Sequence, residues 1–148
     1  MSRSARGLES LVGYMAAFEE IEHTADRAFR VAARDMAGLL EAAAYAMLAL
    51  DGSRPTTGPS AVREIEVEGV DRESLLVNWL NEVLYVEQAH GLACEQFHIE
   101  ELTNYRLRAR VETRVCDQRC RTIKAVTFHN LEVRETALGL EAELVLDV

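Results

Sequence analysis

Three separate segments of the chain carry residue types that could bind a cation or a phosphate. His23 and Asp26 lie three residues apart in HTAD, just ahead of an alternating apolar run. Lys124 is the one lysine among 16 basic residues, and Asp147 precedes the last residue, Val148. Carboxylate oxygens suit hard cations such as Ca²⁺ or Mg²⁺, whereas an ammonium is a compact point charge that approaches a phosphate or carboxylate closely. These segments therefore predict a polar site for a cation or a phosphate.

The two acids converge if the first and last strands of the fold are neighbours. Asp26 precedes an expected strand, and Asp147 ends another, where Val148 adds a terminal carboxylate. If those strands are neighbours, Asp26, Asp147 and Val148 can converge into an oxygen-rich site for a hard cation, with backbone carbonyls and water as further ligands. The spacing alone also allows two solvated acids at strand ends, with His23 ordering the turn.

Other candidate groups favour structural roles. Cys116 and Cys120 have the spacing of half a zinc clip, but no second cysteine pair completes it, so two incidental thiols are the better interpretation. His90 and Gly91 fall at an expected helix end, where an imidazole interacts favourably with the last carbonyls. His98 alternates with apolar residues and is expected on the wet face of a strand. The chain has no GxGxxG, P-loop, HExxH or GxSxG motif.

Composition indicates a globular protein with an acidic surface. Hydrophobic residues make up 49% and charged residues 28%, while the net charge is -9 and the pI near 4.9. Nucleic-acid affinity depends mainly on clustered Lys and Arg, so strong direct binding of nucleic acid is not expected. A basic protein partner or a hard cation suits this charge better, although the acidity could serve solubility alone. Three cysteines and no membrane-spanning stretch predict a reducing, cytoplasmic location without membrane association.

The first two thirds of the sequence predict alternating strands and helices. Residues 1–16 show no clean periodicity and are expected to be a disordered leader, with a single domain over 17–148. Alternation over 29–33 predicts a strand, and Asp35 then offers an N-cap for a helix through Leu50.

The rest of the chain predicts one more helix and several strands. Residues 51–60 contain both prolines and are expected to be a loop, followed by a strand to about Val70. Asp71 is expected to cap a helix that ends at Gly91. Four strands are then expected in FHIEEL, YRLRARVETRV, AVTFHNLEVRE and LEAELVLDV. The fold class predicted is α+β: a two-layer sandwich, mostly antiparallel, with two main helices on one face of the sheet.

Four blocks of the sequence together resemble the archease family, small accessory proteins of the tRNA-splicing RNA ligase. They are FEEIEHTAD, DRESLLVNWLNEVLY, IKAVTFHNLEV and LVLDV, in family order from Phe18 to Val148. The resemblance implies that Asp26, Lys124 and Asp147 form the functional site with a bound divalent cation, Ca²⁺ or Mg²⁺/Mn²⁺. It also matches two family histidines to His23 and His129, and it gives the one lysine a functional reason.

The resemblance implies an assisting role and no catalysis of the protein's own. The partner would be the GTP- and Mn²⁺-dependent ligase that joins 3′-phosphate and 5′-hydroxyl ends, and the protein would promote its guanylylation and multiple turnover. Two other classes stay open: a chaperone-like or RNA-modification adaptor that needs no cation, and a metal-dependent phosphohydrolase. The chain departs from the family at Arg27 and Ala28, where an apolar residue and glycine are usual, and at Val111 and Glu112, in place of a Gly-Glu pair.

Overall fold

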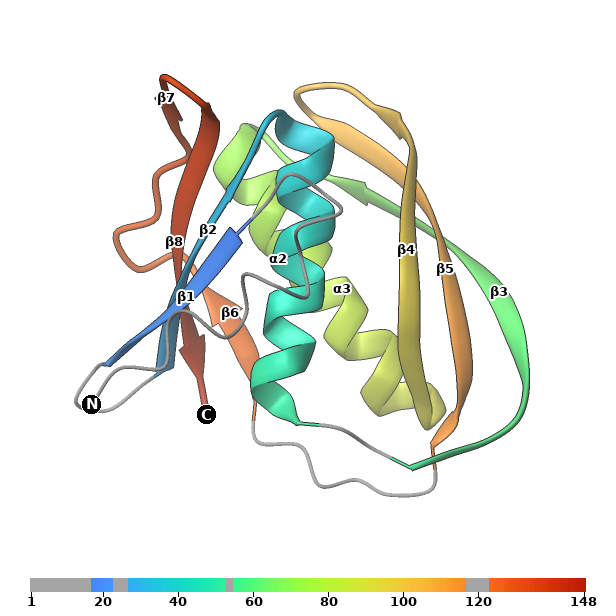
Figure 1. The fold of residues 1–148 in the computed structure, drawn as a ribbon. Helices are drawn as coiled ribbons and strands as arrows, with labels where there is room; N and C mark the ends of the chain where they lie inside the picture. Colours follow the sequence, from blue (N-terminus) through green and yellow to red (C-terminus); the bar gives the residue numbers. More distant parts are fainter. Residues whose placement is uncertain (1–16, 23–26, 53–54, 117–122) are drawn as a thin grey trace.

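Two helices lie between two antiparallel sheets (Figure 1). The computed structural model describes residues 17–22, 27–52, 55–116 and 123–148. The helices are α2 (Met36–Asp51) and α3 (Arg72–His90). The predicted α+β class, with antiparallel strands and two main helices, is confirmed. Its strands, however, divide into two sheets, and each helix contacts strands of both.

The first sheet is built around its last strand. Its strands are β1 (Ala17–Glu22), β2 (Arg27–Ala33), β6 (Ala125–Thr127), β7 (Arg134–Thr136) and β8 (Gly139–Asp147). The order is β1-β2-β8-β6, and β7 also pairs with β8. Phe29, Val31 and Ala33 of β2 are buried, as the alternation predicted, while Arg30 forms an ion pair with Glu19 of β1 at 3.0 Å. This sheet therefore has one face toward the helices.

The second sheet has three long strands in the order β3-β5-β4. They are β3 (Thr56–Glu68), β4 (Leu92–Leu102) and β5 (Arg106–Cys116). Leu107, Ala109 and Val111 of the central strand β5 are buried, whereas the arginines between them face the solvent side. The alternation in YRLRARVETRV thus places one face of β5 on the helices, as expected.

Capping residues fix the starts of both helices where the sequence predicts them. The carboxylate of Asp35 accepts a hydrogen bond from the Gly38 N–H at 2.8 Å at the start of α2. Asp71 accepts one from the Ser74 N–H at 2.8 Å, and the Ser74 hydroxyl accepts one in return from the Asp71 N–H at 3.1 Å. The Ser74 hydrogen bonds hold the pKa of Asp71 below its ordinary value of 3.8. Gly91 ends α3 in the left-handed conformation, at φ 65°.

The division into two sheets follows from how much of each helix is apolar. Runs of neighbouring residues are fully or almost fully buried in α2 (residues 42–44) and in α3 (residues 75–77). Consecutive helical residues point about 100° apart, so such runs can be buried only if more than one side of the helix is covered. One sheet covers one side. The second sheet covers another, and a single hydrophobic cluster includes Phe29 of the first sheet and Phe97 of the second.

Two predicted segments differ from the structure. The expected loop over 51–60 is shorter, because β3 begins at Thr56 and tolerates proline as an edge strand with a register shift between Thr57 and Ala61. The expected strand AVTFHNLEVRE is broken into β6 and β7 by a turn in which Asn130 adopts φ 51°. Strand β1 was not predicted, and the expected leader 1–16 lies outside the described residues.

Candidate functional site

Three strands bring the predicted site segments to one end of the first sheet. Strand β8 runs antiparallel to β2 on one side and to β6 on the other, so its C-terminal end lies beside the N-terminal ends of both. Leu146 is opposite Arg27 of β2 and opposite Val126 of β6. The premise that the first predicted strand and the last are neighbours is therefore confirmed.

Lys124 and Asp147 meet at this end of the sheet. The backbone N–H of Lys124 donates a hydrogen bond to the carbonyl oxygen of Asp147 at 2.7 Å. Both residues are exposed, and Val148 is 38% exposed. The structure thus brings the backbones of these two predicted site residues together at an accessible position, where the end of β8 lies beside the start of β6.

The remaining residues of the predicted cation site are not placed. Asp26 and His23 lie outside the described residues, so the set Asp26, Asp147 and Val148 stays a prediction. Within the described part of the chain, no group of three or more His, Cys, Asp and Glu side chains could hold a metal ion. A hard-cation site here therefore depends on oxygens that Asp26 would add to the carboxylate of Asp147.

His129 lies at the other end of β6 from Lys124. It belongs to the turn after the strand, where its N–H donates to the Thr127 hydroxyl at 3.3 Å and its ring nitrogen lies 3.3 Å from the Asn130 amide. Two residues of the strand separate Lys124 from Thr127, and the turn carries His129 further away. The structure thus does not bring His129 to the Lys124–Asp147 end, and its predicted role stays a prediction.

The other titratable candidates fit structural roles. His90 occupies the last turn of α3, and its ring packs edge-on against Tyr85 at a centroid distance of 6.0 Å. His98 is on the solvent face of β4, as expected, with Nε2 3.9 Å from a Glu112 carboxylate oxygen. Cys116 is buried, whereas Cys120 lies outside the described residues.

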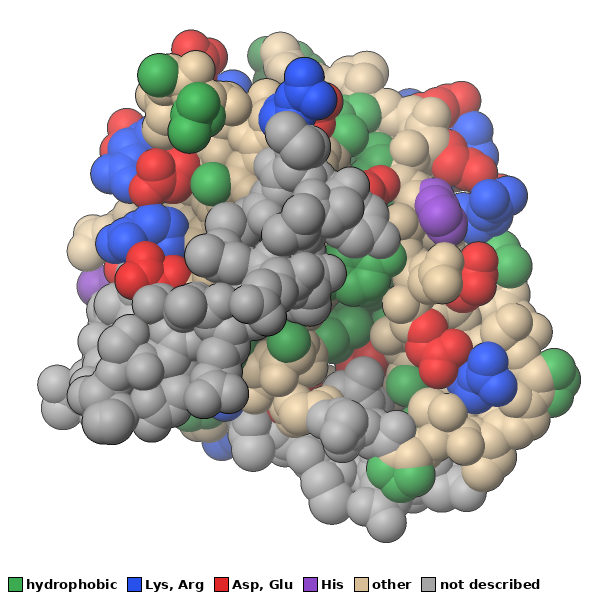
Figure 2. All heavy atoms as spheres, viewed as in Figure 1, with side chains coloured by type: hydrophobic (Ala, Val, Ile, Leu, Met, Phe, Trp, Pro, Cys, Tyr) green, Lys and Arg blue, Asp and Glu red, His purple; other side chains and the backbone are tan. Residues whose placement is uncertain are grey.

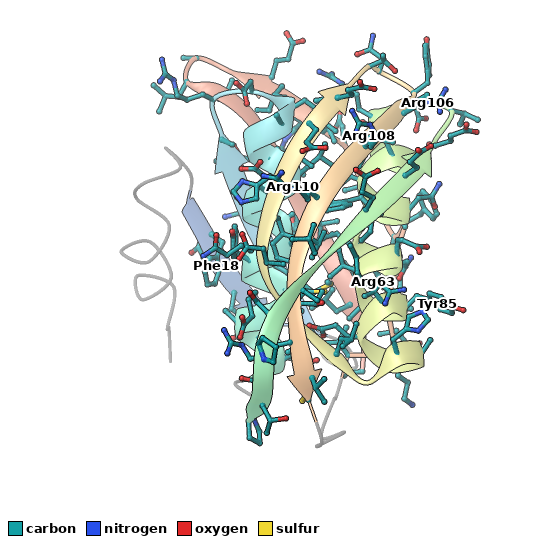
Figure 3. The ribbon with its side chains drawn as sticks, turned by 90° about the vertical axis from the view of Figure 1, so that its right-hand side faces the viewer. Phe18, Arg63, Tyr85, Arg106, Arg108 and Arg110 are labelled. Atoms are coloured by element: carbon teal, nitrogen blue, oxygen red, sulfur yellow. The ribbon has the colours of Figure 1, made fainter. Side chains whose placement is uncertain are left out.

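A row of arginines on the outer face of β5 is balanced by glutamates. Figure 3 shows Arg106, Arg108 and Arg110 along this strand. Arg108 forms ion pairs with Glu100 and Glu101, both at 2.9 Å. The positive charge of Arg108 is therefore balanced by neighbouring carboxylates. The Arg108 hydrogen bond lowers the pKa of Glu101, and the same contact raises the pKa of Arg108.

The face of the molecule in Figure 2 likewise shows acidic and basic side chains interspersed. A phosphate-binding surface needs clustered Lys and Arg without neighbouring acids. Neither the outer face of β5 nor the face in Figure 2 has that composition. In the part of the chain that the structure describes, no helix is both long and apolar enough to cross a bilayer.

Sequence reasoning missed the helix side chains that hold the segment around Lys124. Asn81 and Gln88 of α3 donate hydrogen bonds to backbone carbonyls of Val126 and Ile123, respectively. Asp51, the last residue of α2, accepts one from the Ile123 N–H. No signal in the sequence marked Asn81, because it lies outside the apolar repeat of α3, where Asn78 and Glu82 are also polar.

The fold and this sheet end define a class of small α+β proteins. In this chain two helices separate two antiparallel sheets, and the backbones of the exposed Lys124 and Asp147 meet at one end of the first sheet. A family model described as the Archease protein family matches residues 18–148, which include every described element except the first residue of β1. The chain belongs to the archease family.

Individual relatives agree over most of the chain. Protein archease of Methanopyrus kandleri is 37% identical over 138 residues, which cover 88% of this chain and 99% of that protein. Protein archease of Methanosarcina barkeri is 33% identical over 140 residues, covering 88% and 95%. A crystal structure from Thermotoga maritima, described as an archease and possible chaperone, has a TM-score of 0.64 at 26% identity, covering 86% of this chain and 94% of that one. A solution structure from Methanobacterium thermoautotrophicum has a TM-score of 0.62 at 27% identity, covering 88% and 98%.

Proposed function

We propose that this protein assists the RNA ligase that joins 3′-phosphate and 5′-hydroxyl ends in tRNA splicing and RNA repair. It promotes guanylylation of the ligase and restores the ligase between turnovers, and it does not ligate RNA itself. Membership of the archease family supports this role. The structural observation that carries it is the adjacency of Lys124 and Asp147, two of the three residues that the family resemblance assigns to the site.

Chain connectivity supports the third residue. The peptide bond joins Asp26 to Arg27, and Arg27 is opposite Leu146, the neighbour of Asp147. Asp26 directly precedes Arg27 in the sequence, which supports including it in the proposed site, although its own position lies outside the described residues.

The donor chemistry fits a hard cation. Asp147 offers an exposed carboxylate, and Asp26 would add a second. A divalent cation held there would supply positive charge to oxygens of the partner or its nucleotide. In this proposal the chain's own residues hold that cation, while the Lys124 ammonium contacts a phosphate or a partner carboxylate.

The acidity of the protein supports docking beside a cation-dependent site. Its net charge is -9, and complementary potential between two proteins speeds their encounter. The chain has three cysteines, which cannot all pair within one chain, and this suits the reducing cytoplasm in which we place this role.

The test is multiple-turnover RNA ligation by the ligase of the same organism with GTP and Mn²⁺. Wild-type protein is compared with Lys124→Ala, Asp147→Asn and Asp26→Ala, and Glu132→Gln serves as the matched control, an exposed acid beyond the far end of β6. We expect stimulation by wild type and by the control, and at least a tenfold loss in the three site variants. If the wild-type protein does not stimulate ligation, the proposed role as an assistant of the ligase is refuted.

Cation binding is measured separately, because the ligase itself needs Mn²⁺. Isothermal titration of the protein alone with Ca²⁺ and Mg²⁺ should show binding that Asp147→Asn and Asp26→Ala weaken and Glu132→Gln preserves. Equal binding by all variants would contradict a site at Asp147. Phosphate release from model phosphomonoesters without ligase would instead point to the phosphohydrolase alternative.

A chaperone-like role is the second candidate, because the Thermotoga maritima relative is described as a possible chaperone. Such a role needs no cation and no Lys124. Suppression of aggregation of an unfolded substrate by wild type and by Lys124→Ala alike, without ligase stimulation, would favour it.

A further inference from the structure

Among the strands that the structure describes, β6, which follows Lys124, has a neighbour on one side only. It has three residues, it pairs with β8, and it ends the sheet order on that side. An edge strand presents unpaired N–H and carbonyl groups, and so short a strand has few hydrogen bonds to hold it in place. Helix α3 lies along this free edge, as Figure 1 shows and as contacts between the two elements confirm.

The side chain of Asn81 occupies the place of the missing neighbour strand. Its Nδ2 donates to the carbonyl oxygen of Val126 at 3.1 Å, and its Oδ1 accepts from the N–H of Val126 at 2.9 Å. Two residues that face each other in a hydrogen-bonded antiparallel pair exchange this same pair of bonds. One carboxamide thus satisfies both backbone groups at the middle of β6.

The backbone of Ile123 is held in a similar way from the helices. Its N–H donates to Asp51 Oδ1 at 3.2 Å, and its carbonyl oxygen accepts from Gln88 Nε2 at 3.3 Å. Lys124 therefore lies between two residues whose outward backbone groups are bonded to helix side chains. Its own N–H points the other way, to the Asp147 carbonyl at 2.7 Å.

We propose that Asn81 is a positioning residue for Lys124, holding β6 in register so that Lys124 stays beside Asp147. The functional part of this inference rests on the proposed function of the Lys124 site. Gln88 and Asp51 bond to Ile123, the residue before Lys124, whereas Asn81 makes both bonds at Val126, two residues after Lys124. Loss of the Asn81 carboxamide removes the hydrogen bonds that join the β6 backbone to α3 and leaves its pairing with β8 and the packing of Val126, so local opening of the strand becomes easier and displaces Lys124.

Asn78 provides a matched control on the same helix. It lies three residues before Asn81, and its Nδ2 donates to the carbonyl oxygen of Glu68 at 2.8 Å, at the end of β3 in the other sheet. Asn78→Ala therefore removes an asparagine, a strand contact and the same number of atoms without touching β6.

The test is amide hydrogen exchange, measured residue by residue in Asn81→Ala and Asn78→Ala. The decisive amide is that of Lys124, because its hydrogen-bond partner, Asp147, is untouched by either substitution. We expect the Lys124 amide to exchange roughly tenfold faster or more in Asn81→Ala, after correction for global stability, and at the wild-type rate in Asn78→Ala. A Lys124 amide that stays protected while only that of Val126 exchanges faster would overturn the proposal.

Asn81→Asp tests the two hydrogen bonds to Val126, and it replaces Asn81→Ala in the experiment if that variant does not fold. At neutral pH its carboxylate still accepts from the Val126 N–H but cannot donate to the Val126 carbonyl, so intermediate protection is expected. When protonated at low pH it can again donate and accept, so protection relative to wild type at the same pH should recover. No recovery on protonation would contradict the assigned pair of bonds.

A ligation assay then distinguishes the positioning role of Asn81 from the proposed function of the Lys124 site. Where wild type stimulates the ligase, Asn81→Ala should lower maximal stimulation about tenfold without changing the half-saturating protein concentration, while Asn78→Ala matches wild type. Full stimulation by Asn81→Ala would overturn the positioning role alone. If wild type does not stimulate, the proposed function fails, and the exchange measurement still decides how Lys124 is held.

Discussion

Replacing Trp79 with phenylalanine tests whether the two sheets share one core. Trp79 is fully buried in α3, and its indole N–H donates to the Leu40 carbonyl oxygen of α2 at 2.8 Å. Its ring also meets Phe97 of β4 edge-on, at a centroid distance of 5.7 Å and an interplanar angle of 79°. One side chain thus joins both helices to the second sheet.

The expected loss of unfolding free energy is about 3 kcal/mol. Phenylalanine lacks roughly three of the indole heavy atoms, and about 0.8 kcal/mol for each buried carbon gives about 2 kcal/mol. The lost hydrogen bond to the Leu40 carbonyl adds about 1 kcal/mol. The sum lies at the lower end of the roughly 3–5 kcal/mol that truncation of a buried aromatic to alanine costs.

Urea denaturation followed by far-ultraviolet circular dichroism measures this loss, since Trp79 is the one tryptophan and its fluorescence disappears with it. Tyr85→Phe on the same helix is the control, because Tyr85 is 57% exposed and should change stability by less than about 0.5 kcal/mol. A single transition is expected, because Phe29 and Phe97 of the two sheets lie in one buried cluster. A loss below about 1 kcal/mol, or separate unfolding of the two sheets, would refute the shared core.

Two further substitutions test local features of the fold. Asp71→Ala should have a lower melting temperature than wild type at pH 7, whereas Asp71→Asn, which keeps a cap, should not. Because folding lowers the pKa of Asp71, the difference in melting temperature between wild type and Asp71→Ala should shrink as the pH falls from 3.8 through the lower folded pKa. A difference that does not change with pH would contradict this role of the Asp71 carboxylate. Gly139→Ala should destabilise by about 3 kcal/mol or more in thermal melts, since φ is 146° and a Cβ there would lie 2.2 Å from the Ala33 carbonyl oxygen. The control Gly52→Ala, at φ 91° with open space around it, should cost about 1 kcal/mol, and equal losses would refute the clash.

Features that depend on neighbouring residues were predictable from the sequence. Asp35 and Asp71 cap their helices as expected, because an N-cap needs only the residues within the next turn. Gly91 ends α3 for the same reason. The alternation of Phe29, Val31 and Ala33 placed β2 correctly, because a strand with one buried face shows a period of two.

The division into two sheets was harder to predict, although its signal was present. Alternation shows that a strand has one buried face, but it does not show which strands share a sheet. The apolar runs in residues 42–44 and 75–77 indicated helices covered on more than one side. The break between β6 and β7 depended on one residue, Asn130, in a conformation that asparagine tolerates better than most residues.

The site depended on long-range pairing that spacing cannot supply. Lys124 and Asp147 are adjacent because β6 pairs with β8, and no periodicity in the sequence specifies that pairing. The four family blocks identified these residues without showing how they meet. The role of Asn81 needed the structure, because a polar residue in a helix gives no indication of which strand it contacts.

The proposed site residues and the residues that support them differ in solvent exposure. Substitutions in the two groups should therefore change different measured properties. Lys124 and Asp147 are exposed, so their substitution should change activity with little effect on stability. Asn81 is partly buried and bonded to Val126, so its substitution should change local exchange as well as activity. Trp79 is fully buried, so its substitution should lower global stability. A variant that loses activity can therefore be assigned to the site, to its support or to the core by comparing these three measurements.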